Sequence, residues 1–299
     1  GTEVTALARS RAKAAELSAA GVKVVYGDLD DRPALEQAAQ GQDQVYHVAG
    51  VVAARNEEDF LRFNRDGTGN MLRAAERSGV ARFVLVSSLA AAGPAAPGVP
   101  LSGTEEPRPV TAYGRSKLAA EQVVRSAQCP WTVIRPPMVY GPRDREVLKI
   151  FRIARLGFAP VFGDGRQELS AVHAADLATA LMQAAVAPAA TGRIYHASHP
   201  EIFSSAHLGR AIGTVMGRSV STLTIPRRIG LAALATTETF ARLTGGATIL
   251  PTDKANEFFQ AAWTGDPSRL MQDTGWQPTY DLQRGLAQTY RWYREAGWL

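Results

Sequence analysis

The chain has 299 residues, of which 45% are hydrophobic and 20% charged, values typical of a globular protein with a large core. Its net charge of +5 is spread along the sequence, with no block of lysine or arginine. This distribution argues against a dedicated nucleic-acid surface and is compatible with an anionic cofactor, so we expect no nucleic-acid partner.

The sequence also indicates a cellular compartment. Cys129 is the only cysteine, so no internal disulfide can form and a reducing cytoplasm is the default location. The longest apolar stretches fall well short of the ~18 residues that a membrane-spanning helix needs. The opening residues do not have the pattern of a signal peptide, so we expect none. We therefore expect a cytoplasmic protein with no membrane partner.

Strand and helix patterns alternate over the first 135 residues. The pattern predicts strands at residues 4–8, 22–26, 44–48, 82–86 and 131–134, and helices near 10–20, 31–41, 57–78 and 113–124. The strand at 82–86 is apolar almost throughout, as expected of a strand covered on both faces. The alternation predicts a parallel α/β sheet with crossover helices on both faces.

Two parts of the chain depart from this alternation. Residues 90–110 contain eight glycines and prolines, too many for a regular element, so we expect a long loop of the kind that often carries function. After Arg135, helices with short strands take over. A helix at 174–186 and a strand at 194–197 are expected to rejoin the sheet, and residues 198–299 are predicted to be mostly helical.

Tyr113 and Lys117 form the first candidate for chemistry. They lie four residues apart on a predicted helix, so their side chains share one face. An ammonium beside a phenol lowers the pKa of the phenol from about 10 towards neutrality, where it can act as an acid or a base. The alternative is a pair of surface residues, because this spacing often arises by chance.

Ser88 follows the predicted strand at 82–86, at the carboxyl edge where open α/β sheets bind ligands. Its hydroxyl can donate to a carbonyl or alkoxide oxygen while Tyr113 moves the proton. Serines at strand ends are also common turn formers, which is the simpler interpretation of Ser87. The order of strand, Ser88, loop, Tyr113 and Lys117 is far more specific than either half, so these three residues are our candidate catalytic site.

Several segments around these residues resemble the extended short-chain dehydrogenase/reductases, the NAD(P)-dependent epimerase/dehydratase type of enzyme. They run in the family's order over nearly the whole chain: residues 64–68 (NRDGT), 84–88 (VLVSS), 112–117 (AYGRSK), 134–142 (IRPPMVYGP), 172–176 (VHAAD) and 275–278 (GWQP). By this resemblance, Tyr113 is the proton donor or acceptor and Ser88 holds the substrate oxygen. Lys117 would lower the pKa of Tyr113 and bind the nicotinamide ribose.

The resemblance also implies the architecture. It predicts a Rossmann-type, doubly wound parallel sheet followed by a smaller, mostly helical substrate lobe. We place the NAD(P)-binding domain at residues 1–137, with 172–197 returning to it, and the substrate-binding lobe at 138–299. The family commonly dimerises through helices beside its sheet, so a homodimer is the candidate assembly.

The cofactor half of the resemblance has a gap. The family's glycine-rich loop cradles a pyrophosphate at a helix N-terminus after the first strand. No such motif occurs in this sequence, and residues 1–4 resemble the start of the family's second strand. We therefore expect the first strand, the glycine loop and the first helix to be missing from the sequence in hand.

The remaining cofactor positions favour NADP and leave NAD open. NAD-preferring members place an acid at the end of the second strand, whereas here that end carries Arg9 and no acid. Arg9 could pair with a 2′-phosphate through two hydrogen bonds, or it could be a solvated arginine. The other candidate cofactor residues, placed by resemblance at strand ends, are Asp28 and Leu29 beside adenine, Ala49 and Gly50 where the cofactor lies close, and Lys117, Pro136 and Val139 at the nicotinamide.

The lack of certain residues narrows the range of reactions that this chain could catalyse. Sugar-nucleotide dehydratases of this family follow the strand-end hydroxyl residue with an Asp-Glu pair, whereas Ser88 is followed by Leu89 and Ala90. Epimerases and dehydratases often hold a diphosphate with an arginine where this chain has Leu169, and Arg166 is out of register. The segment 87–94 resembles the 3β-hydroxysteroid dehydrogenase and dihydroflavonol reductase branch, whose members act on apolar ketones or alcohols.

These observations lead to a preferred function with two alternatives. We expect an NAD(P)-dependent enzyme that interconverts a secondary alcohol and a ketone on a small, apolar substrate. A nucleotide-sugar epimerase of the same family is one alternative, and a non-catalytic NAD(P)-binding sensor or assembly protein is the other. No metal is expected, because the histidines lack the spacing of a metal site.

Overall fold

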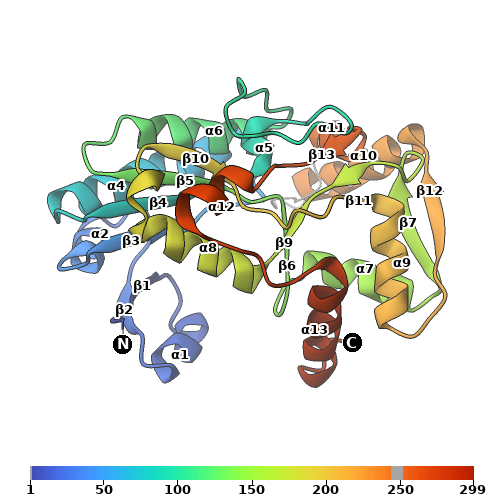
Figure 1. Cartoon of the computed structure of the whole chain (residues 1–299), viewed down its shortest axis with the longest axis horizontal. Helices are drawn as coiled ribbons and strands as arrows, with labels where there is room; N and C mark the ends of the chain where they lie inside the picture. The colour runs from blue at the N-terminus through green and yellow to red at the C-terminus, as the bar shows by residue number, and fades with distance from the viewer. Residues whose placement is uncertain (1, 244–251) are drawn as a thin grey trace.

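The computed structural model describes residues 2–243 and 252–299, and its strands and helices alternate along the chain (Figure 1). The elements of the first half are β1 Thr5–Ala8, α1 Arg11–Ala19, β2 Lys23–Tyr26, α2 Arg32–Ala39, β3 Gln44–His47, α3 Glu57–Leu61, the π-helical turn Arg62–Asp66, α4 Gly67–Arg77, β4 Arg82–Val86, α5 Leu89–Ala92, α6 Ala112–Arg125 and β5 Trp131–Arg135. Those of the second half are β6 Met138–Tyr140, α7 Glu146–Ala154, β7 Phe158–Phe162, β8 Glu168–Leu169, β9 Ala171–His173, α8 Ala174–Val186, β10 Arg193–His196, β11 Phe203–Ser204, α9 Ser205–Val215, β12 Ser221–Ile225, α10 Arg227–Leu243, α11 Ala255–Phe258, β13 Ala262–Trp263, α12 Ser268–Thr274 and α13 Leu282–Glu295, with short 3₁₀ turns at Pro188–Ala190 and Thr252–Lys254.

Four parallel strands in the order β10–β5–β4–β3 form the main sheet. The side chains of the inner strand β4 alternate between the two faces of the sheet. Phe83 and Leu85 pack with α2, α4 and α6, whereas Val84 and Val86 pack with α8 and α12. Every residue of β4 is buried, which explains its apolar sequence. The prediction of a parallel sheet with helices on both faces is confirmed.

A second parallel sheet lies at the start of the chain. β1 and β2 pair with each other in register from Thr5 against Lys23 to Ala8 against Tyr26. Among the described residues, neither strand pairs with the main sheet, and Figure 1 shows them with α1 apart from it. The carboxyl ends of these two strands and of the main sheet carry the candidate cofactor residues.

The second half of the chain contributes to the main sheet as well as to the C-terminal lobe. β10 pairs with β5 and α8 packs against β4, whereas β9 pairs with β6 outside the main sheet. The boundary between a domain of residues 1–137 and a lobe of 138–299 stays a prediction. No helix in the described ranges is both long and apolar enough to cross a membrane.

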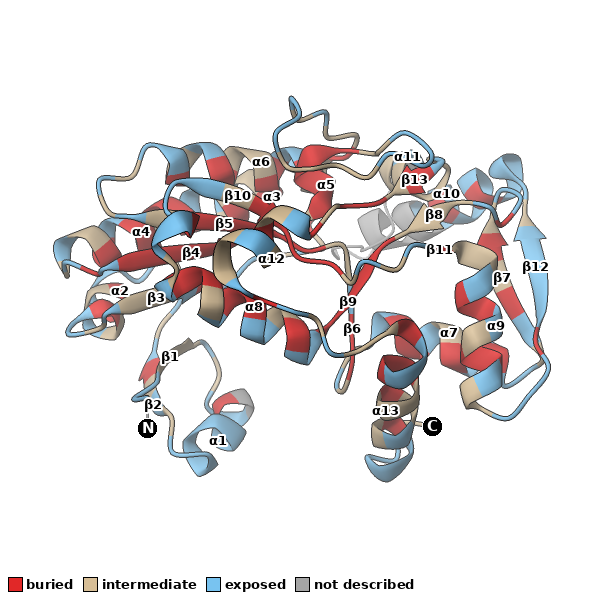
Figure 2. Cartoon of the chain, in the orientation of Figure 1, coloured by how far each residue is buried: buried red, intermediate tan, exposed pale blue. Residues whose placement is uncertain are grey.

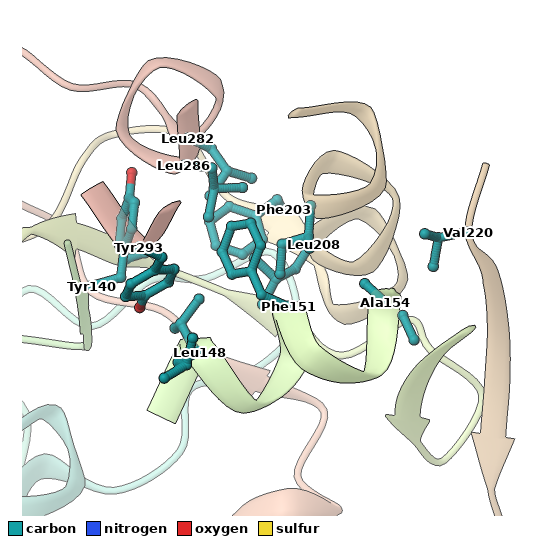
Figure 3. Close-up of a cluster of buried hydrophobic side chains, with 14 residues drawn as sticks. Tyr140, Leu148, Phe151, Ala154, Phe203, Leu208, Val220, Leu282, Leu286 and Tyr293 are labelled. Atoms are coloured by element: carbon teal, nitrogen blue, oxygen red, sulfur yellow. The ribbon is translucent and has the colours of Figure 1, made fainter. Parts of the chain in front are cut away.

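The C-terminal lobe has a hydrophobic core of its own. Figure 3 shows Phe151 of α7 among side chains of α9, α13 and the β11 segment. Tyr293 stands edge-on to the Phe151 ring, with ring centroids 5.5 Å apart. β7 and β12 form a parallel pair at the edge of this core. The lobe is mostly helical, as predicted.

Helices α5 and α6 approach each other closely at Gly114. A Cβ atom at this position would overlap the carbonyl oxygen of Ala90 and would lie 3.1 Å from the Pro109 side chain. Thr111 caps α6 by accepting a hydrogen bond from the Gly114 amide at 3.1 Å. Only glycine therefore lets the start of α6 lie against the turn that follows β4.

We predict that Gly114→Ala lowers the free energy of unfolding by roughly 1–3 kcal/mol, because the two helices must move apart to admit the methyl group. Gly69→Ala in α4 is the matched control, since its new Cβ would meet only the flexible end of Arg73 at 3.3 Å and Val123 at 3.6 Å. That change should be neutral or should stabilise by up to about 1 kcal/mol through helix propensity. Urea unfolding measures both. Equal effects of the two variants would contradict the close approach.

Candidate active site

The structure brings together the hydroxyl groups of Ser88 and Tyr113. Ser88 lies immediately beyond the carboxyl end of β4, where its Oγ caps α5 by accepting from the Ala90 amide at 3.1 Å. Tyr113 stands in the first turn of α6, and its phenol lies near enough to the Ser88 side chain for Ser88 to lower the pKa of the phenol. The two residues meet across the α5–α6 contact although 25 positions separate them in the sequence.

Tyr113 holds its proton strongly. Burial raises the pKa of its phenol to about 12, the nearby Ser88 side chain works in the opposite direction, and the charge of Glu257 raises the pKa further. The ring of Phe60 covers one side of it, with centroids 6.1 Å apart. This differs from the expected shift towards neutrality. The reason is that burial outweighs any nearby cation.

Lys117 is 5% exposed and lies one helical turn beyond Tyr113 on α6. Its Nζ donates to the carbonyl oxygen of Val86, the last residue of β4, at 2.7 Å. Burial lowers the pKa of Lys117 to about 8, while the charge of Glu121 raises it. The ammonium therefore binds the end of the same strand that presents Ser88.

A buried ion pair lies one helical turn beyond Lys117, and sequence reasoning missed it. Glu121 and Arg135 are 1% and 2% exposed and make two hydrogen bonds, of 2.9 Å and 2.6 Å. Ser87 also donates to Glu121, so this serine is not merely a turn former. The spacing of Lys117 and Glu121 on one helix face was the signal available in the sequence.

Asn64 ties the loop after β3 to helix α6. The helix predicted at 57–78 is interrupted by the π-helical turn Arg62–Asp66, which carries Asn64 inward to 1% exposure. Its Oδ1 accepts from the Val51 amide at 2.8 Å, and its Nδ2 donates to Ser116 Oγ at 2.9 Å. Ser116 in turn donates to the Tyr113 carbonyl oxygen at 2.7 Å. Asn64 was noted only as part of a motif.

The far side of Tyr113 is covered by a segment of the C-terminal lobe. Asp253 accepts from the Ala112 amide at 2.7 Å, and Glu257 accepts from the Thr111 hydroxyl at 2.7 Å. Lys254 pairs with Glu257, and its Nζ lies 5.8 Å from the centre of the Tyr113 ring. The lobe is thereby anchored to the first turn of α6.

The candidate cofactor residues lie at the carboxyl ends of the parallel strands. Arg9 and Asp28 are exposed beyond β1 and β2, and Ala49 and Gly50 are exposed beyond β3. Leu29 is partly buried against Gly67. Beyond β5, Pro136 is buried and accepts from the Leu89 amide at 2.8 Å, and Val139 in β6 is 36% exposed.

Gly50 lies close to the side chains of Asn64 and Lys117, and its lack of a side chain fits a cofactor that lies against the backbone there. A Cβ atom there would lie 3.0 Å from Asn64 Oδ1 and 3.7 Å from Lys117 Nζ. The neighbouring Val48, immediately after β3, is 62% exposed. An exposed apolar edge beside a buried ammonium suits a flat, partly apolar and anionic molecule, so the residues present are compatible with a dinucleotide.

The other polar candidates have structural explanations. His47 is 3% exposed and shares a hydrogen bond of 3.0 Å with Thr68, as expected of a core histidine, and burial lowers its pKa to about 3. Cys129 is a partly buried free thiol whose pKa is raised by burial. Within the described residues, no cluster of histidine, cysteine and carboxylate side chains could hold a metal.

Comparisons with known proteins identify the family of this chain. The model of the NAD dependent epimerase/dehydratase family matches residues 1–197. The ceramide reductase of Caulobacter vibrioides is 33% identical over 279 residues, which cover 93% of this chain and 82% of that protein. The UDP-glucose 4-epimerase of Vibrio cholerae is 24% identical over 289 residues, with coverage of 92% and 84%.

A solved structure has the same fold as this chain. The dTDP-glucose 4,6-dehydratase of Streptomyces venezuelae, a double mutant with NAD bound, superposes with a TM-score of 0.77 at 22% identity, covering 99% of this chain and 89% of that one. This likeness shows the Rossmann-type fold. Together with the family match, it shows that this chain belongs to the NAD-dependent epimerase/dehydratase family, the extended short-chain dehydrogenase/reductases.

Proposed function

We propose that this chain is an NADP(H)-dependent reductase that interconverts a ketone and a secondary alcohol on an apolar substrate, with Ser88, Tyr113 and Lys117 as its catalytic residues. The observation that carries the proposal is the proximity of the Ser88 and Tyr113 side chains, with the buried Lys117 one turn further along α6 and bonded to the end of the strand that precedes Ser88. When bound, the nicotinamide would supply or accept the hydride.

The three residues divide the proton transfer between them. Ser88 and Tyr113 together can donate two hydrogen bonds to a carbonyl oxygen, which fixes its position and polarises it. Tyr113 is protonated at neutral pH because its pKa is about 12, so it acts as the acid that completes an alcohol. Lys117 supplies a positive charge near the phenolate that Tyr113 becomes when it gives up its proton.

The cofactor would extend along the carboxyl ends of the strands. Arg9 is proposed to bind the 2′-phosphate, with Asp28 and Leu29 near the adenine. Ala49 and Gly50 are small, so the cofactor could lie close to the backbone at these positions. Lys117, Pro136 and Val139 would contact the nicotinamide end. The exposed guanidinium of Arg9 and the lack of an acid at this strand end support NADP over NAD.

An apolar substrate is supported by the aromatic side chains beside the covering segment. Lys254 lies 6.0 Å from the ring of Phe258, which stacks on Phe162 with centroids 4.4 Å apart. Phe259 meets Phe162 edge-on at 5.5 Å. These rings continue from the Tyr113 side of the site into the C-terminal lobe. The Caulobacter relative, a ceramide reductase by name, also supports a reductase for an apolar substrate.

The two alternatives have less support. Leu169 occupies β8 where epimerases often have an arginine, and the side chain of Arg166 is 90% exposed beside Asp164, so neither is placed to hold a diphosphate. Leu89 and Ala90 are buried where a dehydratase would need acids. A non-catalytic sensor has no physical need for the Ser88–Tyr113 contact.

A small-molecule substrate, a homodimer and a cytoplasmic location complete the proposal. The first follows from the family, whose members act on small molecules or nucleotide sugars. The other two rest on the sequence alone.

We predict that Tyr113→Phe lowers kcat at least about 10³-fold in ketone reduction, because the proton donor is removed. The Kd for NADPH should change less than about threefold, since the ring and Lys117 remain. Consumption of NADPH with an apolar ketone measures turnover and separates a reductase from an epimerase, which consumes none. Tyr46→Phe is the matched control, because its exposed hydroxyl bonds only Gln44. Full activity of the Tyr113 variant would contradict the proposal.

We predict that Arg9→Gln raises the KM for NADPH by about 10- to 100-fold, the effect of losing a charged pair with a phosphate. The KM for NADH should stay within about twofold, because NADH has no 2′-phosphate. Arg11→Gln is the control, since the Arg11 guanidinium lies 4.6 Å above the Tyr26 ring. Steady-state kinetics with both cofactors makes the comparison. An equal loss with NADH and NADPH would refute the role of Arg9.

A further inference from the structure

The parallel pair β7–β12 has one buried and one uncovered face. Ala159 and Val161 of β7 are 1% and 3% exposed on the side of α9. The alternate residues point the other way, and there Phe158 is 51% exposed and Leu223 of β12 is 56% exposed. Figure 2 shows β12 exposed along its length at the edge of the molecule.

Helix α10 continues this uncovered face. Gly230 lies against the rings of Phe162 and Phe259, so the first turns of the helix sit at one end of the β7–β12 pair. Ile229 and Leu231, on either side of Gly230, are 62% and 37% exposed. Leu156, in the turn before β7, is 74% exposed. Leu231, two residues beyond Ile229 on the helix, lies on another side of it. We call Leu156, Phe158, Leu223 and Ile229 the apolar face.

The chain segments that form the apolar face are basic. Residues 155–163 and 218–236, which contain β7, β12, the turns before them and the first turns of α10, have no aspartate or glutamate. They contain four arginines: Arg155, Arg218, Arg227 and Arg228. None of these four takes part in an ion pair of the described residues.

The apolar face is also connected to the candidate active site. Phe158 shares a strand with Phe162, which stacks on Phe258. Phe258 lies beside Lys254, whose ammonium is 5.8 Å from the Tyr113 ring centre. The strand that carries Phe158 on the apolar face therefore also carries a ring of the aromatic cluster that lies towards the reacting phenol.

We propose that the apolar face and its surrounding arginines dock on an anionic lipid bilayer, from which an apolar ketone reaches Tyr113. Exposed apolar side chains with basic residues around them are the combination that binds a membrane interface, whereas a nucleic-acid surface would be polar. The docking is inferred from the surface alone, whereas the delivery of substrate rests on the proposed function. Docking on a bilayer departs from our expectation of no membrane partner, because that expectation considered only membrane-spanning segments.

Cosedimentation of the full chain with vesicles tests the docking without cofactor or substrate. Equal parts of phosphatidylglycerol and phosphatidylcholine should bind the protein, and vesicles of phosphatidylcholine alone should bind it at least about tenfold more weakly. Raising the salt concentration should weaken the binding to the anionic vesicles. Equal binding to both vesicles, or no binding to either, would overturn the proposal.

Two surface variants locate the contact. Leu223→Glu/Ile229→Glu and Arg227→Gln/Arg228→Gln should each lower the partition constant about tenfold or more. The matched controls are Met182→Glu on α8, where Met182 is 59% exposed, and Arg125→Gln/Arg193→Gln on the sheet domain. Circular dichroism checks that all variants fold. Equal losses in variants and controls would overturn the assignment of the face.

The remaining outcomes are also informative. If the face instead joins two copies of the chain, the wild type will be a dimer in sedimentation analysis and Leu223→Glu/Ile229→Glu a monomer, which would refute bilayer docking. If docking delivers the substrate, both surface variants should lose turnover of a vesicle-embedded ketone but keep turnover of a short, water-soluble ketone. Vesicle binding without turnover of any ketone would refute the proposed function and leave the docking surface intact.

Discussion

The burial of the Lys117 ammonium is the constraint on which the rest of the site depends. A charge that is 5% exposed is costly unless polar groups surround it. The Val86 carbonyl oxygen at the end of β4 accepts a hydrogen bond from it, and Glu121 lies one helical turn away. Glu121 is held in turn by Arg135 of β5. Helix α6 is therefore tied by its charges to the ends of two sheet strands.

This attachment explains how the reacting groups come together. Because Lys117 binds the last residue of β4, the first turn of α6 lies beside Ser88, and Tyr113 meets its hydroxyl. Gly114 permits the close approach, and Asp253 and Glu257 hold the same turn from the substrate side. The same burial that stabilises the arrangement keeps the phenol protonated, which favours its action as an acid.

The sequence predicted those features that depend on short-range pattern. Alternating strands and helices indicated the parallel sheet, and the order of Ser88, Tyr113 and Lys117 indicated the candidate site. Contacts between distant segments were not predictable: Asp253 lies 141 residues from the amide that it caps, and Glu121 pairs with an arginine on another element. The raised pKa of Tyr113 was missed for a related reason, since burial is a property of the folded chain and not of the spacing of two residues.

The pH dependence of kcat/KM for ketone reduction tests the central claim that a buried ammonium supports proton transfer from Tyr113. Tyr113 stays protonated up to a pKa of about 12, so it should not limit the rate below that pH. Lys117 loses its proton with a pKa of about 8. The account predicts a constant rate between about pH 6 and 7 and a fall as the pH rises through about 8. A rate that stays constant to pH 10 would contradict it.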